Sequence, residues 1–229
     1  MRGIASLRGA PGLLEAESVL AEALGDEERP RAEEMQDARK LAEVAQSELN
    51  KGFPLLHSQA MVSLWGSLED LMRTFLSAWL ANEPSAKQVE TIRKLKIAVG
   101  EYESLDDYER CFHMVDLLER DVHSPLRQGV SRFESILQPF GLSGKVDSEV
   151  QKRVYELFQV RNALVHRRGV ADRRLTEACP WLNLTPGKPI SVSHEMYAGY
   201  AEAVAQYATQ VVGRVRRRLR RLRQADGAG

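Results

Sequence analysis

The sequence predicts an all-α fold, and two observations support this prediction. Glycine and proline fall almost wholly between long segments in which apolar residues recur every three or four positions, as on one face of a helix. No segment shows the sustained apolar alternation that several strands would require. With 229 residues, of which 43% are hydrophobic and 28% charged, the chain is expected to form one large domain with appendages, and wholesale disorder is excluded.

Charge balance and cysteine content exclude further classes of protein. The 32 basic and 32 acidic residues cancel, so no global charge draws the chain to nucleic acid or to a membrane. Cys111 and Cys179 lie in neither a metal-binding nor a redox spacing, so we expect no disulfide framework, no zinc site and a reducing compartment. Residues 1–12 contain no apolar run typical of a signal peptide or anchor, which predicts a cytoplasmic protein without a membrane partner.

Residues 1–52 are expected to form an acidic helical arm. Eleven acidic residues stand against four basic ones between Leu14 and Asn50. The pattern predicts two helices broken between Gly25 and Pro30. Their weak apolar face suggests a peripheral position.

Residues 53–215 are expected to form the main helical domain, and its best core helix ends before Pro84. The apolar positions of that helix recur at three and four: Met61, Leu64, Trp65, Leu68, Leu71, Met72, Phe75, Leu76 and Trp79. Capping signals then predict helices over residues 85–99, 104–122 and 124–140. These signals are, in order, the pairs Ser85/Gln88 and Ser104/Asp107 and the dipeptide Ser124-Pro125.

The last third of the chain is predicted as two long helices joined by a structured loop. Asp147 is expected to cap a helix from Ser148 to Arg168, which Gly169 stops. Residues 170–193 form the loop, and a final helix begins after Ser193. Seven of the ten residues in Arg214–Arg223 are arginine, so residues 216–229 are interpreted as an arginine-rich helix end and flexible tail.

One cation interrupts the apolar face of the helix that follows Asp147. Turning about 100° per residue, Arg161 falls inside the stripe formed by Val154, Leu157, Leu164 and Val165. Arginine is seldom buried without a partner. Arg161 is therefore expected either to meet a carboxylate in the core, with Glu69 as the candidate, or to open onto a cleft or a subunit interface.

The segment around Arg161 carries residue types that suit phosphodiester chemistry. A guanidinium can bind a phosphate with two hydrogen bonds, a histidine can move a proton near neutral pH, and an asparagine can orient its ring. Arg161, Asn162 and His166 offer this set, and it requires neither a metal nor a cofactor. Groups on one helix cannot flank a phosphate from both sides, so a second copy from another subunit is expected, which predicts a homodimer.

The pattern Arg161-Asn162-x3-His166, followed by Gly169-Val170 and Asp172, resembles the signature of HEPN-domain proteins, particularly the stand-alone bacterial ones. Leu68-Glu69 is similar to a pair in an upstream helix of that family, which makes Glu69 a supporting residue. The resemblance implies a HEPN-like helical bundle and a dimer that juxtaposes two such motifs. It further implies metal-independent endoribonuclease activity, with Arg161 on the scissile phosphate, Asn162 positioning His166, and His166 as general acid or base. Members commonly serve as toxins or antiviral ribonucleases.

Other functions remain open at this point. The basic residues near the motif are predicted to guide RNA: Arg167, Arg168, Arg173 and Arg174. The arginine-rich end is expected either to contact RNA or to dock on the acidic arm. The main alternative function is a non-catalytic HEPN module that binds a nucleotide or a protein. A third possible function is a toxin that a cognate antitoxin or another regulatory partner silences. The chain carries no recognisable nucleotidyltransferase motif, so such a partner would have to be a separate protein.

Overall fold

The computed structural model describes residues 10–19, 32–122 and 128–226. In these residues all regular secondary structure is helical, and the one pairing of extended backbone is an antiparallel bridge between Val170 and Pro189. The predicted all-α class is therefore confirmed. None of the described helices is both long and apolar enough to cross a membrane.

The chain forms two compact units. Unit 1 contains the chain up to His57 together with Ser191–His194. Unit 2 contains Ser58–Ile190 and the chain from Glu195 onward. All the sequence-predicted site residues belong to unit 2.

Unit 1 contains the acidic arm. A helix covers residues 10–19, and α2 covers Ala32–Lys51, so both described parts of the arm are helical. Arg39 of α2 donates a hydrogen bond to the Glu15 carboxylate at 3.0 Å and links the two helices. The predicted break between Gly25 and Pro30 lies outside the described residues.

Helix α3 (Pro54–Asn82) is the core helix that the apolar pattern predicts. Its buried side chains are Met61, Trp65, Leu68, Met72, Leu76, Ser77, Trp79 and Leu80. Leu71, which the pattern assigns to the same face, is instead 46% exposed. It lies about 80° around the helix from Met61, at the edge of that face, which explains the error.

The core of unit 2 forms where α3 meets α7 (Val130–Leu137) and α8 (Ser148–His166). The Trp65 ring of α3 lies 5.6 Å from the Phe133 ring of α7 and 5.2 Å from the Phe158 ring of α8, measured between centroids. These are favourable distances for tilted aromatic pairs. Helix α8, which carries the motif, is thus anchored by its middle to the core.

The chain after α3 departs from the predicted single helix over residues 85–99. It forms η1 (Pro84–Gln88), α4 (Glu90–Arg93) and α5 (Val99–Ser104). The cap is Glu83, whose Oε1 accepts hydrogen bonds from the backbone N–H of Ser85 at 3.3 Å and from its hydroxyl at 2.7 Å. The Ser85 hydroxyl is therefore used as a donor, and the predicted capping box with Gln88 is wrong.

Helix α6 (Asp107–Val122) ends where the predicted helix over residues 104–122 ends, but it begins later and has a different cap. Asp106 and Glu109 form the reciprocal capping box, with backbone-to-carboxylate distances of 2.8 and 2.9 Å. Ser104 instead ends α5, where its hydroxyl donates to the Glu101 carbonyl at 2.7 Å.

The helix predicted over residues 124–140 also begins later. Its first signal, Ser124-Pro125, lies outside the described residues, and α7 starts directly after Gly129, whose φ is 58°. A Cβ at Gly129 would stand 2.9 Å from the Cα atom of Tyr155 in α8. Conformation and space therefore both favour glycine here, and the close approach sets α7 against α8. The end near Gly141 is confirmed, after a turn of 3-10 helix, η2 (Gln138–Phe140).

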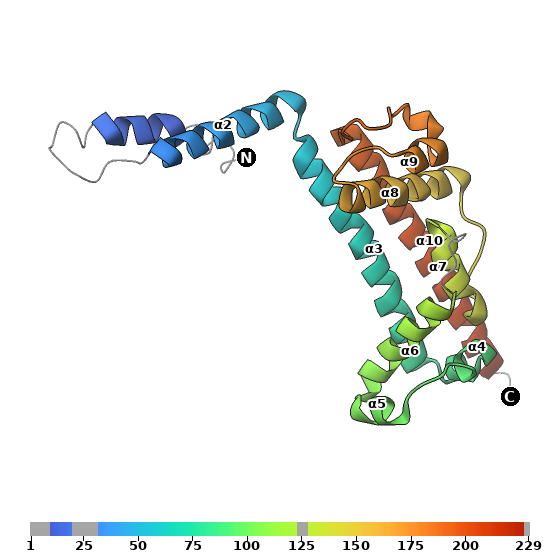
Figure 1. The fold of residues 1–229 in the computed structure, drawn as a ribbon. Helices are drawn as coiled ribbons and strands as arrows, with labels where there is room; N and C mark the ends of the chain where they lie inside the picture. Colours follow the sequence, from blue (N-terminus) through green and yellow to red (C-terminus); the bar gives the residue numbers. More distant parts are fainter. Residues whose placement is uncertain (1–9, 20–31, 123–127, 227–229) are drawn as a thin grey trace. The chain divides into compact units, whose positions relative to one another are not determined.

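The predicted loop over residues 170–193 contains two short helices that the sequence did not predict, α9 (Arg173–Ala178) and η3 (Pro180–Leu182). Helix α10 (His194–Asp226) begins directly after the loop, as predicted, and continues through the arginine run. In Figure 1, α9 lies beside α8, and α10 passes behind α8 and α7.

Two tyrosines attach α10 to the other helices of unit 2. The Tyr200 hydroxyl donates to Glu156 of α8 at 2.6 Å, and the Tyr207 hydroxyl donates to Glu134 of α7 at 2.9 Å. Burial and the adjacent carboxylate raise the pKa of each phenol. Both tyrosines therefore remain protonated donors at any physiological pH.

Candidate functional site

The candidate site forms where α8 ends. The Asp147 carboxylate caps the first turn of this helix as predicted, but the helix stops at His166, two residues before the predicted end. Arg168 and Gly169 both adopt left-handed backbone, with φ values of 55° and 72°. The Gly169 N–H donates to the Ala163 carbonyl at 3.2 Å, which closes the end of the helix.

Backbone hydrogen bonds then fold the chain back along α8. Ala171 donates to the Lys188 carbonyl at 2.9 Å, and Ile190 donates to the Gly169 carbonyl at 2.7 Å. These bonds clamp the turn after α8 onto the end of the loop. As a result, the first residues of α9 lie against the last turns of α8.

A pocket of about 260 Å³ lies between the last turns of α8 and the start of α9, and we call it the α8 pocket. Its lining residues are Gln159, Asn162, Ala163, His166, Arg167, Asp172, Arg174 and Leu175. Four residues that the sequence analysis selected therefore share one cavity: Asn162, His166, Arg167 and Arg174.

Asn162 and His166 lie one helical turn apart and reach the α8 pocket from the same face. The His166 side chain is exposed, and among the described residues it has neither a hydrogen-bond nor an ion-pair partner. Asn162 accepts a hydrogen bond from Arg161 instead of bonding to His166. The imidazole is therefore accessible to a proton donor or acceptor that enters the pocket.

Asp172 places a carboxylate in the α8 pocket. Its Oδ1 accepts the Leu175 N–H at 2.9 Å and caps α9, while its Oδ2 lies 3.2 Å from Nε of Arg167. The backbone hydrogen bond from Leu175, assisted by Arg167, lowers the pKa of Asp172. One cation of the pocket is thus neutralised within the pocket itself.

Arg161 is half-buried and does not line the α8 pocket. Its Nη1 donates to the Asn162 Oδ1 at 3.2 Å. Its Nε is buried without a hydrogen bond, and no carboxylate pairs with it in the described part of the chain. In this arrangement Arg161 acts on the pocket through Asn162.

Of the two alternatives for Arg161, the one in which it pairs with Glu69 is wrong. Glu69 of α3 instead accepts a hydrogen bond from Arg132 of α7 at 2.5 Å. Arg132 also lies 3.6 Å from Glu119, whose pKa is raised by burial although Arg132 opposes the shift. Glu69 therefore belongs to a charge cluster that joins α3, α6 and α7 and does not line the α8 pocket.

The predicted apolar stripe holds only in the first part of α8. Val165 is 44% exposed and Leu164 is half-buried, whereas Val160 and Ala163 are buried. The buried face of α8 shifts around the helix axis near its end because α9 folds back along the last turns of α8. A periodic pattern computed for α8 alone could not contain this second contact.

The remaining predicted residues lie outside the α8 pocket. Arg168 and Arg173 are exposed, and neither lines it. Arg173 begins α9, while Arg168 occupies the left-handed turn. They can add positive charge near the pocket but do not form its walls.

Sequence reasoning missed Glu156, which is buried on α8. Its two carboxylate oxygens accept hydrogen bonds from Trp181 Nε1 at 2.7 Å and from Tyr200 at 2.6 Å, and Arg153 lies 3.8 Å away. Burial, with this carboxylate nearby, raises the pKa of Cys179 to about 12, so that thiol stays protonated. Glutamate is usually exposed, so the sequence carried no signal for this site.

A second, wider pocket of about 630 Å³ lies further along α8. It is lined by Gln128, Val130, Ser131, Ser148, Gln151, Lys152, Tyr155 and Trp181. Tyr155, Gln159 and Asn162 are three or four residues apart, so both pockets lie on one face of α8. A hydrogen bond from Gln159 to Gln128 joins the two linings.

No described group of three or more histidine, cysteine, aspartate or glutamate side chains is placed to hold a metal ion. No family model matches the chain, and neither a curated protein nor a solved structure matches it. The geometry of the α8 pocket therefore carries the functional argument.

Proposed function

We propose that the protein is a metal-independent endoribonuclease of the HEPN type that cuts RNA as a homodimer. The observation that carries the proposal is the α8 pocket. An exposed histidine, an asparagine and two arginines line a single cavity there: His166, Asn162, Arg167 and Arg174. Cations can hold a phosphate in such a cavity while an imidazole moves the proton.

The proposed step is transesterification at a ribose. One imidazole takes the proton from the 2′-hydroxyl, and the 2′-oxygen forms a bond to the adjacent phosphorus. The bond from phosphorus to the 5′-oxygen breaks, and that oxygen is protonated by a second acid. The products are a 2′,3′-cyclic phosphate and a 5′-hydroxyl, so no water or metal enters this step.

The homodimer follows from the need for two proton-transfer groups. The α8 pocket holds one histidine, His166, which can serve as base or acid but not as both in one step. In the proposal, the second protomer's His166 supplies the other role. Arg174 contacts the phosphate together with the Nη groups of Arg167, since only Nε of Arg167 bonds to Asp172. Arg161 is a positioning residue because it reaches the pocket through Asn162.

The second pocket supports a path for single-stranded RNA along α8. Trp181 is 41% exposed, and Nζ of Lys152 lies 4.8 Å from its ring centroid. An exposed aromatic ring beside a cation is a platform on which a base can stack. A strand lying there would lead its next phosphates toward His166.

The test uses purified wild type, Arg161→Ala and His166→Ala with mixed cellular RNA in EDTA. His113→Ala is the matched control, since His113 lies on α6 outside both pockets. Circular dichroism and analytical ultracentrifugation first check that all four proteins are folded dimers. We expect cleavage by wild type and His113→Ala only, with cyclic phosphate ends.

Two outcomes reject the proposal. Cleavage by all four proteins would mean a contaminant or a site elsewhere in the chain. Absence of RNA cleavage by all four proteins would favour the non-catalytic module that binds a nucleotide or a protein. Growth arrest on expression, relieved by His166→Ala, would add a toxin role and justify a search for a separate antitoxin.

A further inference from the structure

A third pocket, of about 290 Å³, lies at the arginine-rich end of α10, and we call it the α10 pocket. Its lining combines the loop after η2 with one face of the helix: Gly141, Ser143, Gly144, Lys145, Arg214, Arg217, Arg218 and Arg221. It contains five cations and no carboxylate. None of these residues takes part in the proposed cleavage site.

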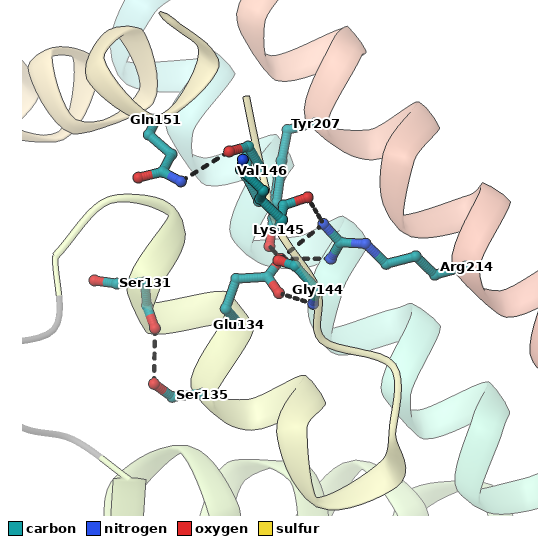
Figure 2. Close-up of polar contacts among 9 residues, drawn as sticks. All are labelled: Ser131, Glu134, Ser135, Gly144, Lys145, Val146, Gln151, Tyr207 and Arg214. Atoms are coloured by element: carbon teal, nitrogen blue, oxygen red, sulfur yellow. Dashed lines mark hydrogen bonds and ion pairs between the residues drawn. The ribbon is translucent and has the colours of Figure 1, made fainter. Parts of the chain in front are cut away.

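The base of the α10 pocket is rigidly built (Figure 2). The Arg214 side chain is 9% exposed and donates to Glu134 of α7 at 2.7 Å. It also donates to the carbonyls of Gly144 and Lys145 at 3.2 and 3.1 Å, while the Gly144 N–H donates to Glu134 at 2.8 Å. A Cβ at Gly144 would lie 3.0 Å from Nε of Arg214, so glycine permits this close approach.

The outer cations of the α10 pocket are not neutralised. Glu134 balances Arg214, but Lys145 and the three outer arginines form no ion pair with any described residue. Arg217 and Arg221 are exposed and lie one turn apart on the same face. Like charges this close repel one another, so a bound anion would stabilise the arrangement.

We infer that the α10 pocket binds the phosphodiester backbone of a nucleic acid. Guanidinium groups bind phosphate with paired hydrogen bonds, and several phosphates in a row match several cations in a row. The lining offers no aromatic or large apolar side chain for a base or a ribose, which disfavours a free nucleotide. Arg216 and Arg220 are exposed on the same helix but do not line the pocket.

The test measures binding of a fluorescent oligothymidylate of about 20 nucleotides by anisotropy over a series of salt concentrations. This probe lacks the 2′-hydroxyl that the proposed cleavage requires, so binding is measured independently of that activity. The test variant is Arg217→Gln/Arg221→Gln. The matched control is Arg216→Gln/Arg220→Gln, which removes the same charge, at the same spacing, from the same helix outside the pocket.

We expect the pocket variant to lose at least about tenfold in affinity. Its plot of log affinity against log salt should become shallower by about 1.4, since each lost phosphate contact on a single strand contributes about 0.7. The control should lose less than half of both quantities. Arg217→Lys/Arg221→Lys keeps the charge and should recover part of the affinity, which separates binding from folding.

Three results would overturn the inference. Equal losses in the two glutamine variants would mean diffuse attraction rather than a pocket. Pocket-dependent binding of inorganic tripolyphosphate without binding of the oligonucleotide would assign the pocket to a small anion. In the third, a peptide with the sequence of α2 is added at the same molar concentration of negative charge as the oligonucleotide. If the peptide displaces the oligonucleotide, docking of the acidic arm is favoured instead.

Discussion

The α8 pocket and the α10 pocket both collect arginines, but they differ in the other groups they contain. The α8 pocket holds a histidine, two amides and the Asp172 carboxylate, which pairs with Arg167 inside the lining. The α10 pocket contains only cations, small residues and backbone, and its single counter-charge, Glu134, lies behind Arg214.

Because of this difference, one pocket can transfer protons and the other can only attract anions. Proton transfer requires a side chain that can both accept and donate a proton, and the α8 pocket contains the imidazole of His166. Arginine remains charged at every physiological pH, so the α10 pocket can attract anions but cannot exchange protons. Two arginine-rich sites in one unit can therefore serve different purposes.

We expect the largest effect from variants of the two pockets, which should change different kinetic parameters. His166→Ala should lower kcat for RNA cleavage about a thousandfold, because it removes the proton-transfer group. Arg217→Gln/Arg221→Gln should instead raise KM for long RNA. Steady-state kinetics with a labelled RNA provide the measurement, and His113→Ala is the control. A matching fall in kcat for both variants would remove the distinction.

The next effect tests the hidden counter-charge of the α10 pocket. Glu134→Gln leaves the guanidinium of Arg214, which is 9% exposed, without its carboxylate. We expect the free energy of unfolding to fall by about 3 kcal/mol, measured by urea denaturation. Glu69→Gln makes the same change at a more exposed pair and should cost about 1 kcal/mol. The reverse order would show that the Glu134 network does not hold α10.

The smallest effect concerns the counter-charge of the α8 pocket. Asp172→Ala removes the cap of α9 and should destabilise the protein by about 1 kcal/mol at neutral pH. The folded protein lowers the pKa of Asp172, so its contribution is present above the ordinary aspartate pKa and is lost as pH falls below it. Unfolding curves of the variant and wild type should approach each other as the pH falls from about 4 through the lower pKa of the folded protein. A constant difference down to about pH 2 would contradict this account.

The long helices were predictable because their signal is local. The repeats of apolar residues in α3 and α10 specify a buried face without reference to the rest of the chain, and the Asp147 cap was read from neighbouring residues alone. The segment after α3 was mispredicted since Ser85 matches a capping pattern, yet its hydroxyl bonds to Glu83. Short patterns of this kind have several local solutions, and packing selects among them.

At the candidate site, likewise, some residues were predictable from local spacing and others were not. The spacing of Asn162 and His166 on one helix predicts that they share a face, and both do line the α8 pocket. Asp172 and Arg174 enter that pocket only because α9 folds back, and the hydrogen bonds that produce this fold join residues far apart in sequence. The direction of Arg161 was also beyond prediction, because it depends on which carboxylates the other helices bring near.

The all-helical class, the principal helices and the residue types at the candidate site could be predicted from the amino-acid sequence alone. These follow from the local rules of helical periodicity and capping. The partner of each carboxylate could be known only from the packed fold: Arg132 for Glu69, Arg214 for Glu134, and Trp181 for the buried Glu156. The physical reason is that the energy of a charge depends on its partners and its burial, and distant segments create both when they pack together.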